Sequence, residues 1–145
     1  MRAIVQRVKR TALSVEERLI SEISHGLTVY LGVYRGDTEA QAAKMAKKIA
    51  ALRIFENEAG KMTYSVRDTR GEILLVSQFT LCADCSHGNR PDFLSAEAPA
   101  EAERLYLRTA QLLEDEGVTV RMGVFGADMQ IEQHNDGPVT ILLEF

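Results

Sequence analysis

The chain has 145 residues, of which 46% are apolar and 26% charged, and its formal net charge is −4 at pH 7. No apolar run is long enough to cross a bilayer, and no apolar segment with a cleavage site follows the basic start, so we expect a cytoplasmic protein without membrane partners. Two cysteines do not make a disulfide framework, and the negative net charge argues against bulk binding of nucleic acid, although it permits a local basic patch.

The first half of the chain predicts three strands, a helix and a short hairpin. The helix is expected over 38–55, with Asp37 as its N-cap, and the hairpin over 56–66, through Gly60. Three β-rich segments, separated by turn residues, are expected as strands: 2–15, 18–24 and 27–34. One face of the helix is apolar at spacings of three and four residues: Ala42, Met45, Ala46, Ile49 and Leu52.

The second half predicts a buried strand, a loop, another helix and three final strands. The segment 72–81, "EILLVSQFTL", carries the strongest strand signal, and 83–98 is expected as a loop. Pro99 suits the first turn of a helix that Gly117 ends. The inward face of this helix is expected to comprise Ala102, Leu105, Tyr106, Thr109, Leu112 and Leu113. The final strands are expected at 118–125, 129–134 and 139–145.

The order of these elements favours an α+β fold. Consecutive strands at both ends of the chain indicate an antiparallel or mixed β-sheet rather than repeating βαβ units. We therefore predict a single compact domain over 1–145 with two main helices. A final strand at an edge of the sheet invites pairing with a second chain, so we expect a homodimer.

The segment "SQFTL" places polar residues at the end of a buried strand. Alternation directs Ser77 and Phe79 to one face of the sheet, and Gln78 and Thr80 to the other. Buried hydroxyls and amides need hydrogen-bond partners. The segment is therefore either satisfied by nearby backbone or forms a polar cluster that faces a ligand.

A thiol pair and a loop arginine follow this segment. Cys82-x-x-Cys85, with His87 nearby, resembles half of a zinc site or a redox pair, but a structural zinc needs four ligands and no second pair exists. We therefore favour two incidental thiols and expect no metal and no cofactor. Arg90 lies in a loop, where a guanidinium is either solvated or well suited to grip phosphate.

Two groups of cations provide candidate patches for a polyanion, although solvated surfaces are the commoner explanation for exposed Lys and Arg. One group lies near the start of the chain: Arg2, Arg7, Lys9 and Arg10. The other falls on neighbouring turns of the first predicted helix: Lys44, Lys47 and Lys48.

Gly137-Pro138 stands at the start of the last predicted strand, where neither residue favours a strand. Proline cannot donate to a ladder of hydrogen bonds, and glycine is costly to order. No nucleophile elbow, phosphate loop or zinc-protease helix motif is present. The residues alone therefore indicate an α+β domain with a polar pocket candidate near 77–90 and an unusual Gly-Pro.

Six short motifs in this order and spacing resemble the D-aminoacyl-tRNA deacylases. The most specific are "SQFTL" at 77–81 and "NDGPVT" at 135–140. The others are "QRV" at 6–8, "GKM" at 60–62, "GNRPDF" at 88–93 and "FGADMQ" at 125–130. The resemblance extends from Met1 to the end of the chain, and "CADC" departs from it.

The resemblance implies an enzyme that hydrolyses the ester between a D-amino acid and the 3′-terminal adenosine of tRNA, with glycyl-tRNA, including glycine mischarged on tRNA-Ala, as a further substrate. It implies a homodimer in which Gly137 and Pro138, joined by a cis bond, reach into the partner's active site. Their carbonyls would bind the substrate's ammonium group and exclude the side chain of an L-amino acid. The expected partners are therefore tRNA and a second copy of the chain, and DNA is not expected as a partner.

The same resemblance assigns the catalytic segment to Ser77, Gln78, Phe79 and Thr80. Gln78 and backbone amides near Phe79 would stabilise the oxyanion, and Phe79 would lie near the adenine. Thr80 has no visible base beside it, so assistance by the 2′-hydroxyl of the adenosine is the preferred mechanism over a Thr80 nucleophile. Weaker contacts to substrate or tRNA are assigned to Arg7, Arg90 and Met129. The alternatives are a catalytically silent tRNA-binding module and a thiol or metal protein.

Overall fold

Strand β1 (Arg2–Val15) organises the fold, because three other strands pair with it. The computed structural model describes all residues from Met1 to Phe145. The antiparallel partners of β1 are β2 (Arg18–Ile23), β3 (Gly26–Gly32) and β8 (Gln130–Glu144). The sheet continues in parallel from β3 to β6 (Glu72–Ser77) and on to β7 (Thr119–Met122). The mixed sheet predicted from the sequence is therefore confirmed.

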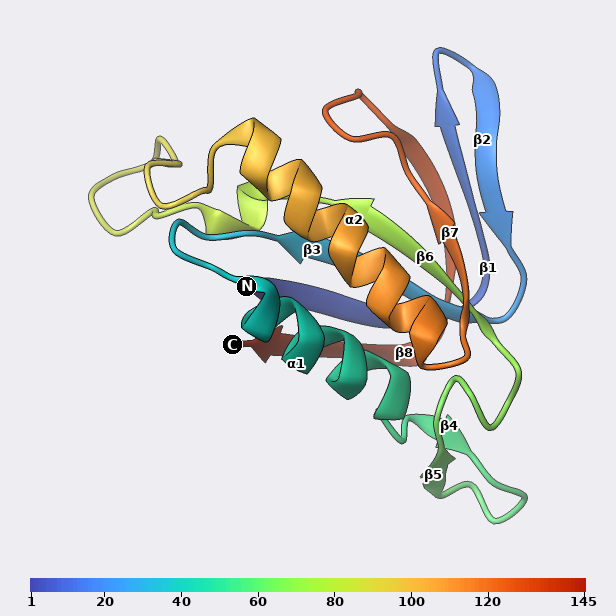
Figure 1. Ribbon diagram of the computed structural model, residues 1–145. Helices are drawn as coiled ribbons and strands as arrows, with labels where there is room; N and C mark the ends of the chain where they lie inside the picture. Colours follow the sequence, from blue (N-terminus) through green and yellow to red (C-terminus); the bar gives the residue numbers. More distant parts are fainter.

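The sheet is strongly curved and nearly closes on itself (Figure 1). In the order β2-β1-β3-β6-β7, the two end strands approach each other. The hydroxyl of Ser21 in β2 donates to the carbonyl oxygen of Met122 in β7, at 2.6 Å. Strand β8 pairs with β1 alone, so its other side is an unpaired edge, as the sequence indicated.

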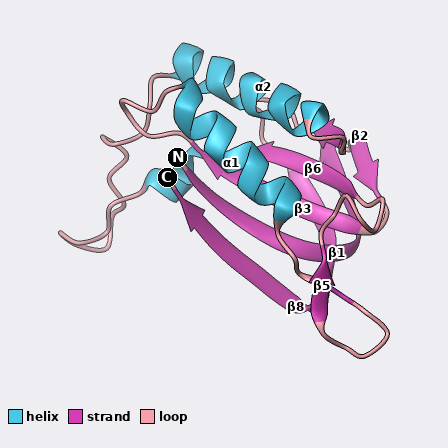
Figure 2. Cartoon of the chain, turned by 60° about the horizontal axis from the view of Figure 1, so that its bottom comes forward, coloured by secondary structure: helices cyan, strands magenta, loops and turns pink.

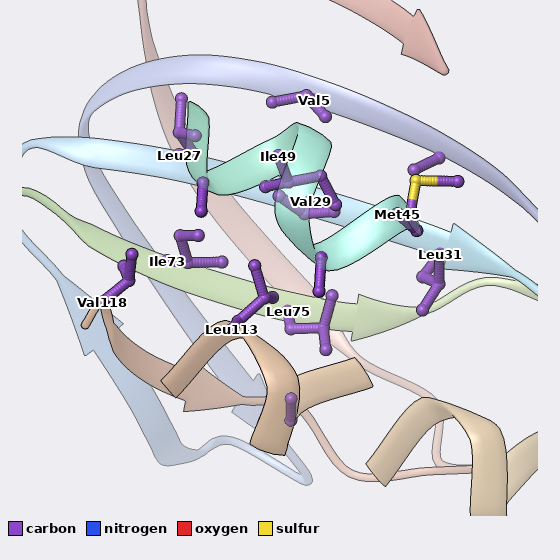
Figure 3. Close-up of a cluster of buried hydrophobic side chains, with 14 of the residues drawn as sticks. Val5, Leu27, Val29, Leu31, Met45, Ile49, Ile73, Leu75, Leu113 and Val118 are labelled. Atoms are coloured by element: carbon purple, nitrogen blue, oxygen red, sulfur yellow. The ribbon is translucent and has the colours of Figure 1, made fainter. Parts of the chain in front are cut away.

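Two helices, α1 (Glu39–Ala51) and α2 (Pro99–Asp115), cover one face of the sheet (Figure 2). Buried side chains between these helices and the sheet form the main core (Figure 3), which includes Val5, Val29, Met45, Ile49 and Leu113. A smaller cluster fills the opposite, concave side of the sheet: Val8, Leu13, Ile23, Leu74 and Val76. Neither helix is long and apolar enough to cross a membrane.

The boundaries of α1 differ from the prediction at both ends. Thr38, not Asp37, is the N-cap, because its hydroxyl and the Gln41 side chain form a capping box. Asp37 instead accepts hydrogen bonds from the amino group of Met1 and from the backbone N–H of Tyr34, both at 2.7 Å. The helix ends at Ala51 rather than at residue 55, since Phe55 joins the predicted hairpin, β4 (Phe55–Glu56) and β5 (Met62–Tyr64).

Strand β6 ends four residues earlier than predicted. It pairs with β3 as far as Ser77, and a short 3₁₀ helix, η1 (Phe79–Cys82), follows. The expected alternation of side chains from Ser77 to Thr80 is therefore wrong. The turn packs closely over the end of β3, where a Cβ added to Gly32 would lie 3.0 Å from the Leu81 Cβ.

The two strands predicted at 129–134 and 139–145 are one continuous strand, β8. It stays paired with β1 on both sides of the Gly-Pro, from Gln130 to Glu144. Between these paired segments, β8 advances by five residues, from Asn135 to Thr140, while β1 advances by only two, from Gln6 to Val8. Gly137 and Pro138 therefore lie in a bulge, where a missing N–H costs no ladder bond. Strand β7 also ends early, at Met122.

Candidate active site

A cavity of about 580 Å³ lies at the carboxyl end of β6. Its apolar floor comes from the ends of β3 and β6, including Leu31 and Val76. Ser77, Gln78 and Phe79 form one wall. The opposite wall is formed by the start of α2 and by the segment from Phe125 to Met129 that leads into β8. The cavity thus includes three of the four predicted catalytic residues and Met129.

The start of η1 presents two backbone donors without protein acceptors. The N–H of Gln78 donates to the carbonyl oxygen of Leu31 at 2.8 Å, which anchors the segment to β3. The N–H groups of Phe79 and Thr80 are the first of the 3₁₀ helix and make no hydrogen bond to the protein. Such free donors can stabilise a developing oxyanion.

The side chain of Thr80 is committed to a local contact. Its hydroxyl oxygen accepts a hydrogen bond from the side-chain amide of Gln78. Both side chains sit at the surface of η1, and no basic side chain contacts the Thr80 hydroxyl. This arrangement provides polar donors and acceptors at the cavity but no activating base for Thr80.

The ring of Phe79 is 57% exposed and is held in place by another aromatic residue. It makes an edge contact with Phe93, with ring centroids 5.0 Å apart. Phe93 belongs to the loop predicted at 83–98, which is closed by two backbone hydrogen bonds between Asp84 and Asp92, of 2.8 and 2.9 Å. The exposed face of Phe79 is therefore available for stacking on a planar ligand.

The C-terminal part of η1 is held by one residue from β1 and one from the segment that follows β3. The carbonyl oxygen of Leu81 accepts from the Arg2 guanidinium at 2.9 Å and from the Tyr34 hydroxyl at 3.3 Å. Arg2 also pairs with Glu144 in β8, at 3.1 Å. Burial raises the pKa of the Tyr34 hydroxyl, which remains a proton donor at neutral pH. These contacts tie η1 to both ends of the chain.

Gly137 and Pro138 are exposed, and the peptide bond between them is cis, as the family resemblance implies. Arg7 supports their bulge from below: its Nε donates to the carbonyl oxygen of Asp136 at 3.1 Å, and its Nη1 to that of Ile54 at 2.6 Å. Arg7 is only 5% exposed. Within one chain, neither Gly137 nor Pro138 lines the cavity, so the fold does not bring them to Ser77 and Gln78.

The other predicted contact and thiol residues lie apart from the cavity lining. Arg90 is exposed in the 83–98 loop and makes no side-chain hydrogen bond. Cys82 is buried and its thiol donates to the carbonyl oxygen of Val33 at 3.4 Å, whereas Cys85 is exposed. Burial raises the pKa of the Cys82 thiol. No three His, Cys, Asp or Glu residues are grouped closely enough to hold a metal ion.

Sequence reasoning missed several residues that line the cavity, among them Glu97, Phe125 and Asp128. Phe125 and Asp128 belong to the motif "FGADMQ", from which only Met129 was singled out, so a signal was present. Glu97 had none. Its carboxylate accepts from the backbone N–H groups of Ala98, at 2.8 Å, and Gly36, at 3.2 Å, so it holds the start of α2 in place.

Comparison with known proteins shows which family the chain belongs to. Residues 4–144 match the family model described as D-Tyr-tRNA(Tyr) deacylase. The D-aminoacyl-tRNA deacylase of Magnetococcus marinus is 54% identical, over 99% of this chain and 96% of that protein. The one of Myxococcus xanthus is 51% identical, over 99% of this chain and 94% of that protein.

Two solved structures share the fold along the whole chain. The "c-Myc DNA Unwinding Element Binding Protein" is 43% identical with a TM-score of 0.92, over 100% of this chain and 99% of that one. A probable eukaryotic D-amino acid tRNA deacylase is 18% identical with a TM-score of 0.84, over 98% and 97% of the two chains. From the family match and the near-complete relatives, we conclude that the chain belongs to the D-aminoacyl-tRNA deacylases, hydrolases that act on D-aminoacyl-tRNA.

Proposed function

We propose that the cavity beside η1 is where the ester of D-aminoacyl-tRNA is cleaved. The observation that carries this proposal is the pair of free N–H groups at Phe79 and Thr80, next to the Gln78 amide. Water attacks the ester carbonyl, and these donors stabilise the negative charge on the tetrahedral intermediate. The bond to the 3′ oxygen then breaks, which releases the D-amino acid and tRNA with a free 3′-hydroxyl.

The vicinal 2′-hydroxyl of the terminal adenosine assists proton transfer in this reaction. It lies next to the leaving oxygen in any aminoacyl ester of adenosine, and it can pass a proton from the attacking water to that oxygen. The contact between Thr80 and Gln78 supports this role, because no base activates the Thr80 hydroxyl as a nucleophile. Phe79 then stacks beside the adenine, and Ser77 and Gln78 orient the ribose and the ester.

Chirality is tested by Gly137 and Pro138 of a second copy of the chain. Both residues are exposed in the bulge of β8, and they do not reach the cavity of their own chain. The unpaired edge of β8 and the 60% exposed side chain of Leu142 on the same strand favour a two-fold symmetric homodimer. In each site, backbone carbonyls of the partner would accept the substrate's ammonium group and occupy the space of an L side chain.

This filter acts on the α-carbon and not on the nature of the side chain. Different D-amino acids are therefore substrates, and glycine, which has no side chain to exclude, is cleaved as well, including glycine carried by tRNA-Ala. L-amino acids are rejected because even a methyl group would press against the carbonyls. Rejection of the wrong partner by steric conflict needs no side-chain pocket.

The deciding experiment is single-turnover deacylation of D-Tyr-, L-Tyr- and Gly-tRNA, with D-Tyr-tRNA ending in 2′-deoxyadenosine as a fourth substrate. We expect cleavage of D-Tyr- and Gly-tRNA, rejection of L-Tyr-tRNA and a large loss of rate with the deoxy substrate. Binding of tRNA without any cleavage would identify a silent binding module instead. A fully active monomer in sedimentation experiments would overturn the cross-subunit filter.

A further inference from the structure

A basic groove runs along the exposed side of α1, away from the cavity. It has a volume of about 510 Å³ and lies between α1 and the end of β8. Figure 1 shows the C-terminus beside α1. We refer to this surface as the α1 groove, and its lining includes four cations and an aromatic ring: Lys44, Lys47, Lys48, Arg53 and Phe145.

The cations of the α1 groove are not neutralised by the protein. None of the four lies within ion-pair distance of a carboxylate, whereas the paired cations are elsewhere: Arg2, Arg7, Lys9, Arg10, Arg67, Arg104, Arg108 and Arg121. Lys48 is in the last turn of α1, where the helix dipole favours a cation. That explanation does not extend to Lys44 and Lys47. A concave surface with like charges in a chain of net charge −4 attracts an anionic partner.

One end of the α1 groove, at Phe145, lies near the end of the sheet that carries the cavity. Phe145 follows Glu144, which pairs with Arg2 at 3.1 Å, and Arg2 donates to Leu81 of η1 at 2.9 Å. The groove and the catalytic segment are therefore linked through one side chain. A polymer whose terminal unit occupies the cavity can continue past Arg2 onto α1.

The composition of the groove fits single-stranded nucleic acid. Proteins bind such strands with a positively charged groove for the phosphates and aromatic side chains for the bases. Three lysines on one face of α1 provide the first feature, and the ring of Phe145, which is 41% exposed, provides the second. We propose that the α1 groove binds the phosphodiester backbone of the 3′ arm of tRNA and so holds the substrate while its ester lies in the cavity.

This inference rests on the proposed function, and it is tested by the double variant Lys44→Ala/Lys48→Ala. The matched control is Arg18→Ala/Arg70→Ala, which removes the same charge from exposed residues outside the groove that have no carboxylate partner. Unfolding curves check that both proteins fold. Fluorescence anisotropy with labelled, uncharged tRNA is measured over a range of salt concentrations, and steady-state kinetics use D-Tyr-tRNA and D-tyrosyl-adenosine.

The lysine variant is expected to bind tRNA roughly 10-fold more weakly, with a salt slope smaller by about 1.5, because two phosphate contacts are lost. Its KM for D-Tyr-tRNA rises with little change in kcat, and hydrolysis of D-tyrosyl-adenosine is unaffected. The control variant behaves as the parent. If the parent protein cleaved neither substrate, the proposed function would be wrong. The anisotropy experiment would still test whether the α1 groove binds tRNA.

Three results would overturn the proposal. The lysine variant could bind tRNA as tightly as the parent, which would leave no role for these cations. Both double variants could lose affinity equally, which would indicate bulk charge rather than a site. A change in sedimentation confined to the lysine variant, with tRNA binding intact, would assign the α1 groove to contact between copies of the chain.

Discussion

The hydroxyl of Tyr106 in α2 donates a hydrogen bond of 2.8 Å to the carbonyl oxygen of Leu75 in β6. The same oxygen accepts from the backbone N–H of Gly123, at 3.0 Å. One carbonyl therefore joins α2, β6 and the segment that leads to the far wall of the cavity. Burial raises the pKa of the Tyr106 hydroxyl, so that it remains a neutral donor across the physiological range.

Tyr106→Phe should destabilise the protein by about 1 kcal/mol, the net value of one buried hydrogen bond. The loss is modest because Leu75 keeps its second donor, Gly123. In a protein of this size, the melting temperature should fall by about 2–4 °C. Tyr64→Phe, at an exposed position in β5, is the control and should melt as the parent does. Equal melting temperatures for the two variants would contradict the role of Tyr106.

Gly137→Ala should disturb the bulge of β8. The residue has φ of +126°, and an added Cβ would lie 2.9 Å from Val139 Cγ2 and 3.2 Å from Arg7 Nη2. We expect a loss of stability of about 1–3 kcal/mol from backbone strain and a large loss of D-Tyr-tRNA cleavage. Gly60→Ala shares the positive φ but meets no atom within 4 Å. The Gly60→Ala variant should therefore keep its activity. If it lost as much activity as Gly137→Ala, close contact of the added Cβ would not explain the effect at Gly137.

Gln78→Ala and Thr80→Ala should separate the two roles assigned to η1. If the Gln78 amide stabilises the oxyanion, its removal lowers kcat by about 10²-fold or more. Thr80→Ala removes only an acceptor for that amide, so substantial activity should remain. The measurement is single-turnover cleavage of D-Tyr-tRNA by each variant. A covalent D-aminoacyl adduct on Thr80, detected by mass spectrometry, would reverse the assignment.

The two cysteines should respond differently to replacement. Cys82→Ala leaves a small void beside Val33 and should cost about 1 kcal/mol of stability, whereas Cys85→Ala, at an exposed position, should change stability by less than about 0.5 kcal/mol. Both variants should retain deacylase activity, and chelators should have no effect on the parent. Stoichiometric zinc in the purified protein would show that this interpretation is wrong.

Acid should weaken the link between the two helices. The Arg104 guanidinium in α2 lies 2.7 Å from the carboxylate of Glu39 in α1. It lies at the same distance from the carboxylate of Glu101, in the first turn of α2. Its hydrogen bonds lower the pKa of both carboxyl groups. A carboxyl pKa that is lower in the folded than in the unfolded state contributes stability above the unfolded value, near pH 4.3, and loses it as the pH falls toward the folded value.

The stability difference between the parent and Arg104→Gln should therefore be largest near neutral pH and shrink below about pH 4.3. Urea unfolding at a series of pH values measures it. Arg18→Gln, which changes an exposed cation without a carboxylate partner, provides the baseline. A difference that stays constant from neutral pH into acid would indicate that Arg104 acts through packing rather than through these carboxylates.

The long strand that pairs with three others could be predicted closely from the sequence. The limits of β1 match the prediction at both ends, because its β-rich pattern coincides with its pairing partners. Residues 78–81 continue the same kind of pattern but leave the sheet and turn into η1, which begins at Phe79, since β3 offers no partner beyond the pair of Leu31 with Ser77. Whether a strand continues depends on its neighbour in the sheet, which local sequence does not specify.

In the candidate site, only the residues that belong to recognisable sequence motifs could be predicted. "SQFTL" does line the cavity through Ser77, Gln78 and Phe79, and Met129 lies opposite. Local rules placed a strand boundary at Gly137-Pro138, yet pairing with β1 on both sides keeps β8 continuous. Glu97 enters the lining through tertiary contacts of a loop with the start of α2, and no pattern in its neighbourhood indicates this.

The continuity of β8 sets a constraint on how such chains can change length during evolution. One strand carries Ile131 at the cavity, Gly137 in the bulge and Glu144 beside Arg2. Inserting or deleting a single residue between them would shift these positions by roughly 3.3 Å and turn the following side chains to the opposite face. Length differences between homologous chains should therefore accumulate in the turn from Asn57 to Lys61, while the spacing from 131 to 144 stays constant.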